Sequence, residues 1–336
     1  MHPILIARRD VEHVTTTASP PVAPTRRAAP APLPEPEEAR ALVRRLLQVP
    51  MSLRRFTVTP AVAAGMHRVD AALLELLVDA GLPAAGRDGD RLFDGYDIGN
   101  AALHLDRMSV QRRAIRTWGA ALREGTGDPR ARSLELVSTC PVPGHAGPCR
   151  YDVLQPGGAR RRVEAAGEDE AELGSVVVPA PSPAPDLPDD VTGLLHELDG
   201  VDFFLLPEVI RWDHDLMWRT GMGDCGVIAD WLVTEGRRRG RETRFSFGLL
   251  TASPYATPHC WADFRVDGRW VAVDPVLVRA MTRWGGLDGR NFPAHVPIDP
   301  IVHRLSDRFT KVVSHGGIWS SLSARTTWVN PEPERQ

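Results

Sequence analysis

The stretch from residue 221 to residue 275 constrains this chain most, because it places three chemically capable side chains in segments whose local structure is predictable. It reads Gly-Met-Gly-Asp-Cys-Gly-Val-Ile-Ala, later Pro-His-Cys-Trp-Ala-Asp-Phe, and finally Arg-Trp-Val-Ala-Val-Asp-Pro. The three side chains are Cys225, His259 and Asp274. Each stands at a predicted helix start or in a predicted strand.

Cys225 is predicted to be the first residue of a helix. Asp224 is a good N-cap, and residues 226–239 have the apolar content of a helix that ends at Gly240. Free backbone N–H groups and the positive end of the helix dipole favour a thiolate at this position, and the thiolate is the nucleophilic form of cysteine. The charge of Asp224 acts against the thiolate, so the dipole alone does not account for activation.

His259 and Asp274 are predicted to meet through a hairpin. Residues 259–266 and 269–276 form two predicted strands around Asp267-Gly268, a strong hairpin signal. A two-residue turn pairs Val266 with Arg269 and sets Trp261 opposite Asp274, so that His259 and Asp274 become diagonal neighbours. In this register one face is apolar, with Ala262, Phe264, Val266, Val271 and Val273, and the other carries His259, Trp261, Asp263, Trp270 and Asp274.

A thiol at a helix start that faces an imidazole oriented by a carboxylate is the arrangement of nucleophile, base and orienter used in acyl transfer. Taken alone, a cysteine at a helix start is more often structural, and a histidine in a strand is more often a core or surface residue. The combination of all three favours a catalytic interpretation.

The stretch resembles the transglutaminase-like superfamily, a papain-like group with a Cys-His-Asp triad. Its bacterial members carry G-x-C-x-x-x-A at a helix start, a later G-x-x-x-R, an H-x-W strand and a W-x-x-x-D-P strand. The matching residues are Gly223, Cys225 and Ala229, then Gly240 and Arg244, then His259 and Trp261, and finally Trp270, Asp274 and Pro275. The resemblance implies that Cys225 is the nucleophile, His259 the base and Asp274 its orienter, with no metal or organic cofactor.

Composition limits the class of protein. With 336 residues and 43% hydrophobic residues the chain can bury at least one core, and we expect two lobes. A net charge of −3 gives no general attraction to nucleic acid or to anionic membranes. The chain has no apolar run of membrane-spanning length and its first residues do not form a secretory signal, so we expect a cytoplasmic protein with reduced cysteines.

The expected fold class is α+β: a papain-like, transglutaminase-like core in which the nucleophile helix packs on an antiparallel sheet, with an N-terminal helical lobe and a small β-rich segment. Residues 1–50 are expected to be a largely disordered arm rich in proline and alanine, with a short helix possible from Glu37 to Gln48. The helical lobe is expected over 51–130, the β-rich segment over 131–180 and the catalytic domain over 181–330. Five prolines between Pro179 and Pro188 form a linker before that domain.

Cys140, His145 and Cys149 surround one loop of the β-rich segment. They are only three ligand-type residues and match no tight C-x-x-C knuckle, so the sequence does not favour a metal site.

Eight of the nine tryptophans follow residue 211. Trp212 and Trp218 lie near the nucleophile in sequence and are candidates, with Trp261, to line a shielded substrate pocket, although core packing is the alternative. Trp218 is also a candidate donor to an oxyanion. The basic run Arg237, Arg238, Arg239 and Arg241 suits a solvated helix end, and its alternative role is to dock an acidic or phosphate-bearing partner.

The predicted chemistry is acyl transfer from an amide or thioester of a small peptide or amino-acyl substrate, free or bound to a carrier, through a thioester on Cys225. If the acceptor is an amine, the enzyme is an amide-forming acyltransferase, which we favour slightly. If the acceptor is water, it is an amidase or cysteine peptidase. A non-catalytic binding module with the same fold is the alternative outside enzymes.

Overall fold

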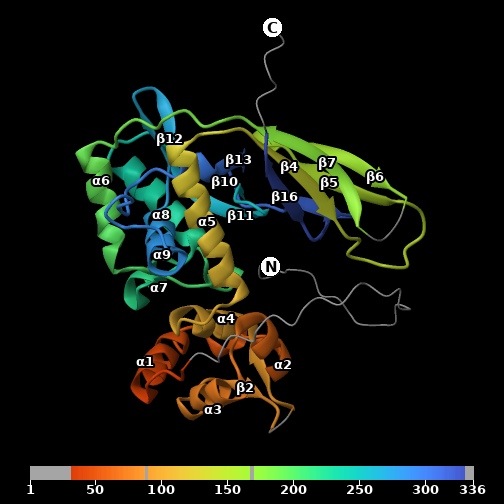
Figure 1. The fold of residues 1–336 in the computed structure, drawn as a ribbon, viewed down its shortest axis with the longest axis vertical. Coiled ribbons are helices and arrows are strands. Elements are labelled where there is room, and N and C mark those ends of the chain that lie inside the picture. The colour runs from red at the N-terminus through yellow and green to blue at the C-terminus, as the bar shows by residue number, and fades with distance from the viewer. Residues whose placement is uncertain (1–31, 88–89, 167–169, 330–336) are drawn as a thin grey trace, which may run out of the picture.

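The N-terminal part of the chain forms a helical lobe at the bottom of Figure 1. A computed structural model describes residues 32–87, 90–166 and 170–329. The elements of the lobe are α1 (Pro36–Leu46), β1 (Phe56–Val58), α2 (Pro60–Val62), α3 (Ala71–Asp79), β2 (Ala84–Ala85), β3 (Leu92–Asp94) and α4 (Gly95–His104). The strands pair in the order β1-β3-β2, and the helices enclose a core that contains Val43, Leu77 and Ile98.

Helix α1 packs in this lobe where the sequence allowed a short helix from Glu37 to Gln48, so residues 36–46 are not part of a disordered arm. Ala39, Val43 and Leu46 are at most 1% exposed in the lobe core. At the end of the helix, the guanidinium of Arg54 donates to the carbonyls of Leu46 and Val49 and pairs with Asp97 at 2.7 Å, with both side chains buried. The part of the expected arm formed by residues 1–31 lies outside the described residues.

The apolar stretch of residues 62–80 does not form one continuous helix. Thr59 caps α2, because its hydroxyl accepts from the N–H of Val62. Arg68 then adopts a left-handed conformation with φ of 58°, which ends the turn after α2. Asp70 caps a new helix, α3, by accepting from the N–H of Leu73.

A long helix, α5 (Val110–Gly127), runs from the lobe along the rest of the molecule (Figure 1). The remaining helices are α6 (Asp189–His196), α7 (His214–Thr220), α8 (Cys225–Arg238) and α9 (Pro275–Gly285). Helices α5 and α9 pack closely because each has a glycine where they cross, Gly119 on α5 and Gly285 on α9. A Cβ added at Gly285 would lie 2.9 Å from the carbonyl oxygen of Ile115.

One large sheet forms the centre of the catalytic part. Its strands are β10 (Thr243–Leu250), β11 (Tyr255–Val266), β12 (Arg269–Val273), β13 (Val302–Ser306), β16 (Ser323–Trp328), β4 (Arg132–Ser138) and β7 (Ala171–Val178). The order is β13-β10-β11-β16-β4-β7, with β12 also paired to β11, and neighbouring strands are antiparallel. The structure is α+β, as the sequence predicts.

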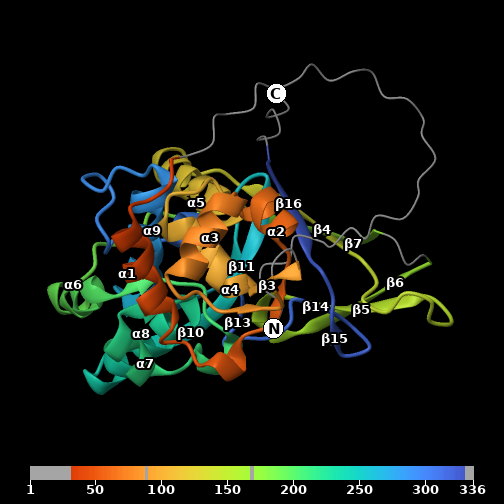
Figure 2. The same cartoon turned by 90° about the horizontal axis from the view of Figure 1, so that it is seen from below.

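The expected β-rich segment over 131–180 is therefore split between two sheets. Strands β4 and β7 extend the central sheet, whereas β5 (Cys149–Leu154) and β6 (Arg160–Ala165) join β14 (Val313–His315) and β15 (Ile318–Trp319) in a smaller one, in the order β15-β14-β5-β6. A parallel pair, β8 (Asp202–Phe203) and β9 (Met222–Gly223), leads into α8. Figure 2 shows β5 and β6 on the side of the molecule opposite α7 and α8.

The predicted hairpin register is confirmed. Val266 pairs with Arg269 and Ala262 with Val273, and Asp267 and Gly268 in the turn both have positive φ, 48° and 75°. The apolar face predicted for the hairpin packs against α8 in one buried cluster that includes Val227 and Trp231.

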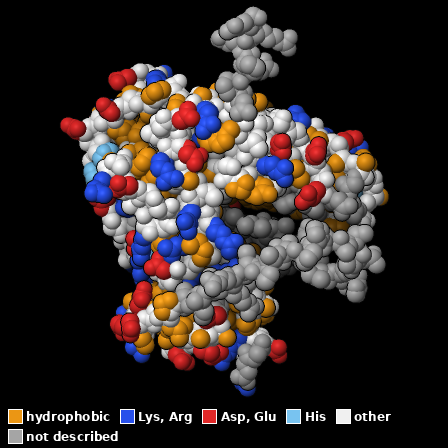
Figure 3. All heavy atoms as spheres, in the orientation of Figure 1, with side chains coloured by type: hydrophobic (Ala, Val, Ile, Leu, Met, Phe, Trp, Pro, Cys, Tyr) orange, Lys and Arg blue, Asp and Glu red, His pale blue; other side chains and the backbone are white. Residues whose placement is uncertain are grey.

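Lys and Arg side chains gather on the surface where α5 meets the helical lobe (Figure 3). The half of α5 nearest the lobe carries Arg112, Arg113 and Arg116. Among the described residues, no helix combines the length and the apolar character needed to cross a membrane.

Candidate active site

Cys225 is the first residue of α8, as predicted. Asp224 caps the helix: its Oδ1 accepts from the N–H of Gly226 at 3.0 Å. The thiol is half-buried, and its side chain packs against the core of the central sheet. The local sequence therefore presents a thiol beside the unpaired N–H groups at the start of a helix.

Arg211 resolves the conflict between the charge of Asp224 and a thiolate at Cys225. Its Nε lies 2.6 Å from Oδ2 of Asp224, and the two side chains are only 9% and 5% exposed. Burial raises the pKa of Asp224 to about 7, and the Arg211 guanidinium acts in the opposite direction. Gly226 makes room for this pair, since a Cβ there would come 2.4 Å from Cγ of Arg211.

His259 and Asp274 meet where the hairpin register places them. Nε2 of His259 lies 2.9 Å from Oδ2 of Asp274, with both side chains buried. The other oxygen of Asp274 accepts from the N–H of Leu277 at 2.9 Å and so caps α9. Asp274 is therefore held from two sides, and Nδ1 of His259 is the ring nitrogen left for the thiol.

The thiol and the imidazole interact directly. A hydrogen bond from Cys260 and the charge of the His259 ring hold the pKa of Cys225 well below its ordinary value, although burial opposes this shift. Burial alone would lower the pKa of His259, but the Cys225 thiolate and the hydrogen bond to Asp274 raise it to about 10. The arrangement favours a thiolate and imidazolium pair at neutral pH.

Aromatic side chains border the cluster on which the thiol packs. Trp212 is 37% exposed, and its ring lies 5.9 Å from that of Phe245 and 6.0 Å from that of Phe309. Phe309 also contacts Trp319 and the guanidinium of Arg211. Cys225, Phe245 and Phe309 border the same buried cluster, so the exposed ring of Trp212 contacts two side chains of the cluster on which the nucleophile packs.

The other two tryptophans named from the sequence lie elsewhere. Trp218 is 45% exposed and packs edge-on against Trp231 on α8, at 5.1 Å between ring centroids. Trp261 is 1% exposed and donates to Asp263 at 2.8 Å. Because an inaccessible ring cannot line a pocket, we assign Trp261 to packing in place of the expected substrate contact.

The helical lobe reaches the site through α4. Asn100 docks the helix by exchanging two hydrogen bonds with the backbone of Leu205, at 2.8 and 2.9 Å. Tyr96, one turn earlier, is close enough to Arg211 and Asp224 for their charges to act on its hydroxyl, and burial raises its pKa. Neither Tyr96 nor Arg211 was named from the sequence, because no short-range sequence pattern identifies a residue whose partners become neighbours only when the chain folds.

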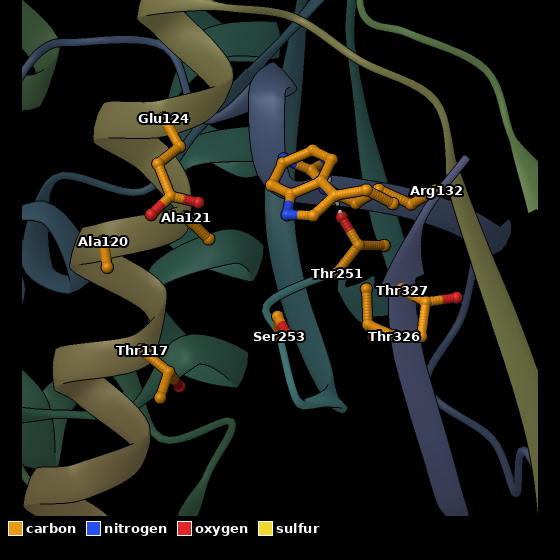
Figure 4. A pocket seen from close by; sticks show the side chains of 10 residues that line it. Thr117, Ala120, Ala121, Glu124, Arg132, Thr251, Ser253, Thr326 and Thr327 are labelled. Atoms are coloured by element: carbon orange, nitrogen blue, oxygen red, sulfur yellow. Dashed lines mark hydrogen bonds between the residues drawn. The ribbon is translucent and has the colours of Figure 1, made fainter. Parts of the chain in front are cut away.

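Two pockets among the described residues do not include the triad. One, of about 300 Å³, lies between α5 and β16; Thr117 and Glu124 face Thr326 and Thr327 across it (Figure 4). The other, of about 410 Å³, is lined by residues of β8 and α9, among them Asp202, Arg279 and Trp284. Neither is therefore the site at which Cys225 would act.

Three of the four arginines in the basic run at the end of α8 pair with carboxylates of the chain, and Arg237 donates to the carbonyl of Thr243. Arg238 pairs with Glu235, Arg239 with Glu197 and Arg241 with Asp190. These contacts favour the solvated helix end over a docking site for an acidic partner.

Comparison with known proteins bears on the family resemblance. Residues 207–275, about a fifth of the chain, match the model of the transglutaminase-like superfamily. A search of curated proteins finds no match. A solved structure from Cytophaga hutchinsonii, described as a candidate cysteine protease, is similar over 60% of this chain and 91% of its own, at 11% identity and a TM-score of 0.31, too low to carry an inference. The family match confirms the resemblance: residues 207–275, which contain Cys225, His259 and Asp274, form a transglutaminase-like core.

Proposed function

We propose that this protein is a cysteine-dependent acyltransferase that forms an amide through a thioester on Cys225. The observation that carries the proposal is the chain of contacts from the thiol to His259 and from His259 to Asp274 at 2.9 Å. The acyl donor is an amide or thioester of a small peptide or amino-acyl group.

In the first half-reaction the Cys225 thiolate attacks the donor carbonyl carbon. The tetrahedral intermediate then expels the leaving nitrogen or sulfur, which takes the proton on Nδ1 of His259. The backbone N–H of Cys225, at the helix start, donates a hydrogen bond to the developing oxyanion in this mechanism. Asp274 keeps the imidazole ring in place, because its second oxygen is fixed by the cap of α9.

In the second half-reaction an amine attacks the thioester carbon. The neutral imidazole accepts a proton from the amine, and the Cys225 thiolate leaves. Atoms balance, since the acyl group moves from donor to amine and the enzyme returns to its starting ion pair. With water in place of the amine the same steps give a free acid, which is the amidase or peptidase alternative.

The surroundings of the thiol support an amine over water. Trp212 is exposed and contacts Phe245 and Phe309, which border the same buried cluster as Cys225. An acyl group that covers this surface would displace water from the thioester, whereas an amine with an apolar part could still dock there. Trp212 is therefore the substrate-binding residue that we retain from the sequence-based candidates.

Product analysis with an activated acyl thioester, with and without millimolar amine, tests the proposal. We expect amide to form faster than free acid with at least one amine of a varied panel. The Cys225→Ala variant is the control for uncatalysed aminolysis. Free acid as the only enzymatic product across the panel would refute the transferase and leave the hydrolase.

A further inference from the structure

The fold completes a four-residue cluster far from the triad. Cys140 and His145 come from the loop between β4 and β5, Cys149 is the first residue of β5, and His315 is the last residue of β14. One ligand atom of each of the four side chains lies within 4.8 Å of the others. Sequence spacing gives three of these residues, and strand pairing adds the fourth, since His315 lies opposite Tyr151 on β5.

We propose that this cluster is a structural zinc site with two thiolate and two imidazole ligands. A tetrahedral Zn²⁺ with bonds of about 2.3 Å to sulfur and about 2.0–2.1 Å to nitrogen separates its ligand atoms by about 3.3–3.8 Å. The observed upper limit of 4.8 Å is therefore close to the required geometry, and small side-chain rotations suffice.

The orientation of His145 fits a metal ligand. Its Nδ1 lies 3.1 Å from the carbonyl oxygen of Ala146, and its Nε2 lies 3.3 Å from Sγ of Cys149. Metal-binding histidines commonly donate one ring N–H to a carbonyl and present the other nitrogen to the metal. The ring of His315 lies 4.7 Å from that of His145, on the same side as the two cysteines.

The chemistry of the four ligands selects the metal. Two soft thiolates and two imidazoles in a tetrahedral set suit Zn²⁺ and do not suit Mg²⁺ or Ca²⁺, which prefer oxygen. All four positions are supplied by the protein, so no position is left for substrate, as is typical of structural zinc. Cys140 and Cys149 are buried, whereas the two histidines are half-buried, which leaves a path for the ion.

The site would join the two sheets. Cys140 follows β4 of the central sheet by two residues, while Cys149 begins β5 and His315 ends β14 of the smaller sheet. The connecting loop, residues 139–148, has neither helix nor strand and turns at Gly144 and Gly147, which both have positive φ. Because this loop has no strand pairing to hold it, a bound metal would fix its position. The metal would thereby hold β5 and β14 against the end of β4.

The test is metal analysis of the purified full chain after exchange into metal-free buffer. We expect about one zinc per chain, and X-ray absorption at the zinc edge should show two sulfur and two nitrogen neighbours. Cys140→Ser and His315→Ala should lose most of the zinc. The matched controls, Cys225→Ala and the exposed His196→Ala, should retain it. Removal of zinc by a strong chelator should lower Tm by several degrees.

Three results would overturn the proposal: no zinc in protein expressed with added zinc, retention of zinc by both ligand variants, or a disulfide between Cys140 and Cys149 in the metal-free native protein. If the variants do not fold, absorption spectroscopy on the unmodified chain decides alone. A zinc environment without two sulfurs and two nitrogens would then refute the site.

Discussion

Replacement of Arg211 by methionine should destabilise the protein strongly, because it leaves a buried carboxylate without its cation. The pair is 2.6 Å apart and its side chains are 9% and 5% exposed. Removal of one partner from such a buried pair costs about 3–5 kcal/mol of unfolding free energy. In Arg211→Met/Asp224→Asn the charge is gone and the amide oxygen can still cap α8, so the double variant should recover about 2 kcal/mol.

The loss should depend on pH. The pKa of Asp224 in the folded protein is about 7, above its ordinary value near 4, so the folded state holds this proton more tightly than the unfolded state. Stability from this group is thus lost as the pH rises between these two values. Without Arg211 the pKa rises further, so Arg211→Met should be closest to wild type at pH 5 and furthest from it at pH 8.

Urea unfolding at both pH values measures these differences, with the exposed Arg290→Met as the matched control. A loss below about 1 kcal/mol in Arg211→Met, or a double variant no more stable than the single one, would refute the role of the buried pair.

Three further predictions concern the triad and the lobe. The rate of Cys225 alkylation, followed by mass spectrometry, should be nearly constant across neutral pH, because the pKa of the thiol is lowered and that of His259 is raised. In His259→Ala the alkylation rate should instead rise near pH 8.5, about the pKa of a free thiol. Asp274→Ala should lose about 1 kcal/mol more stability in urea than Asp274→Asn, which keeps an oxygen to cap α9, and equal losses would contradict the cap. A chain that starts at Met51 should melt several degrees lower than the full chain, because it lacks the buried face of α1; an unchanged Tm would show that α1 is dispensable.

Local signals predict the elements that carry the triad. Asp224 and Gly240 bracket α8, and the Asp267-Gly268 turn fixes the register that brings His259 to Asp274. Both follow from short-range rules, namely helix capping and the two-residue periodicity of strands. For this reason the geometry of the site was predictable although its catalytic role stays a prediction.

Long-range pairing explains what the sequence did not predict. Arg211 reaches Asp224 through the packing of the segment before α7, Tyr96 arrives on α4, and His315 joins Cys140 only because β14 pairs with β5. Likewise, β4 and β7 pair with each other and read as a separate unit, because β16, the strand that joins β4 to the central sheet, lies more than a hundred residues away. A short helix at α1 was foreseen from local sequence, but its packing was not, because the core that it joins is built from residues as distant as Leu77 and Ile98.

The most direct test of the account is to trap the acyl group on the enzyme. The protein is mixed with an activated acyl thioester in the absence of amine, quenched in acid and mapped by peptide mass spectrometry. We predict a single acyl adduct on Cys225 that disappears when amine is added, and no adduct in Cys225→Ala. Acylation of Cys260 in place of Cys225, or no adduct with any donor that the enzyme turns over, would contradict the mechanism.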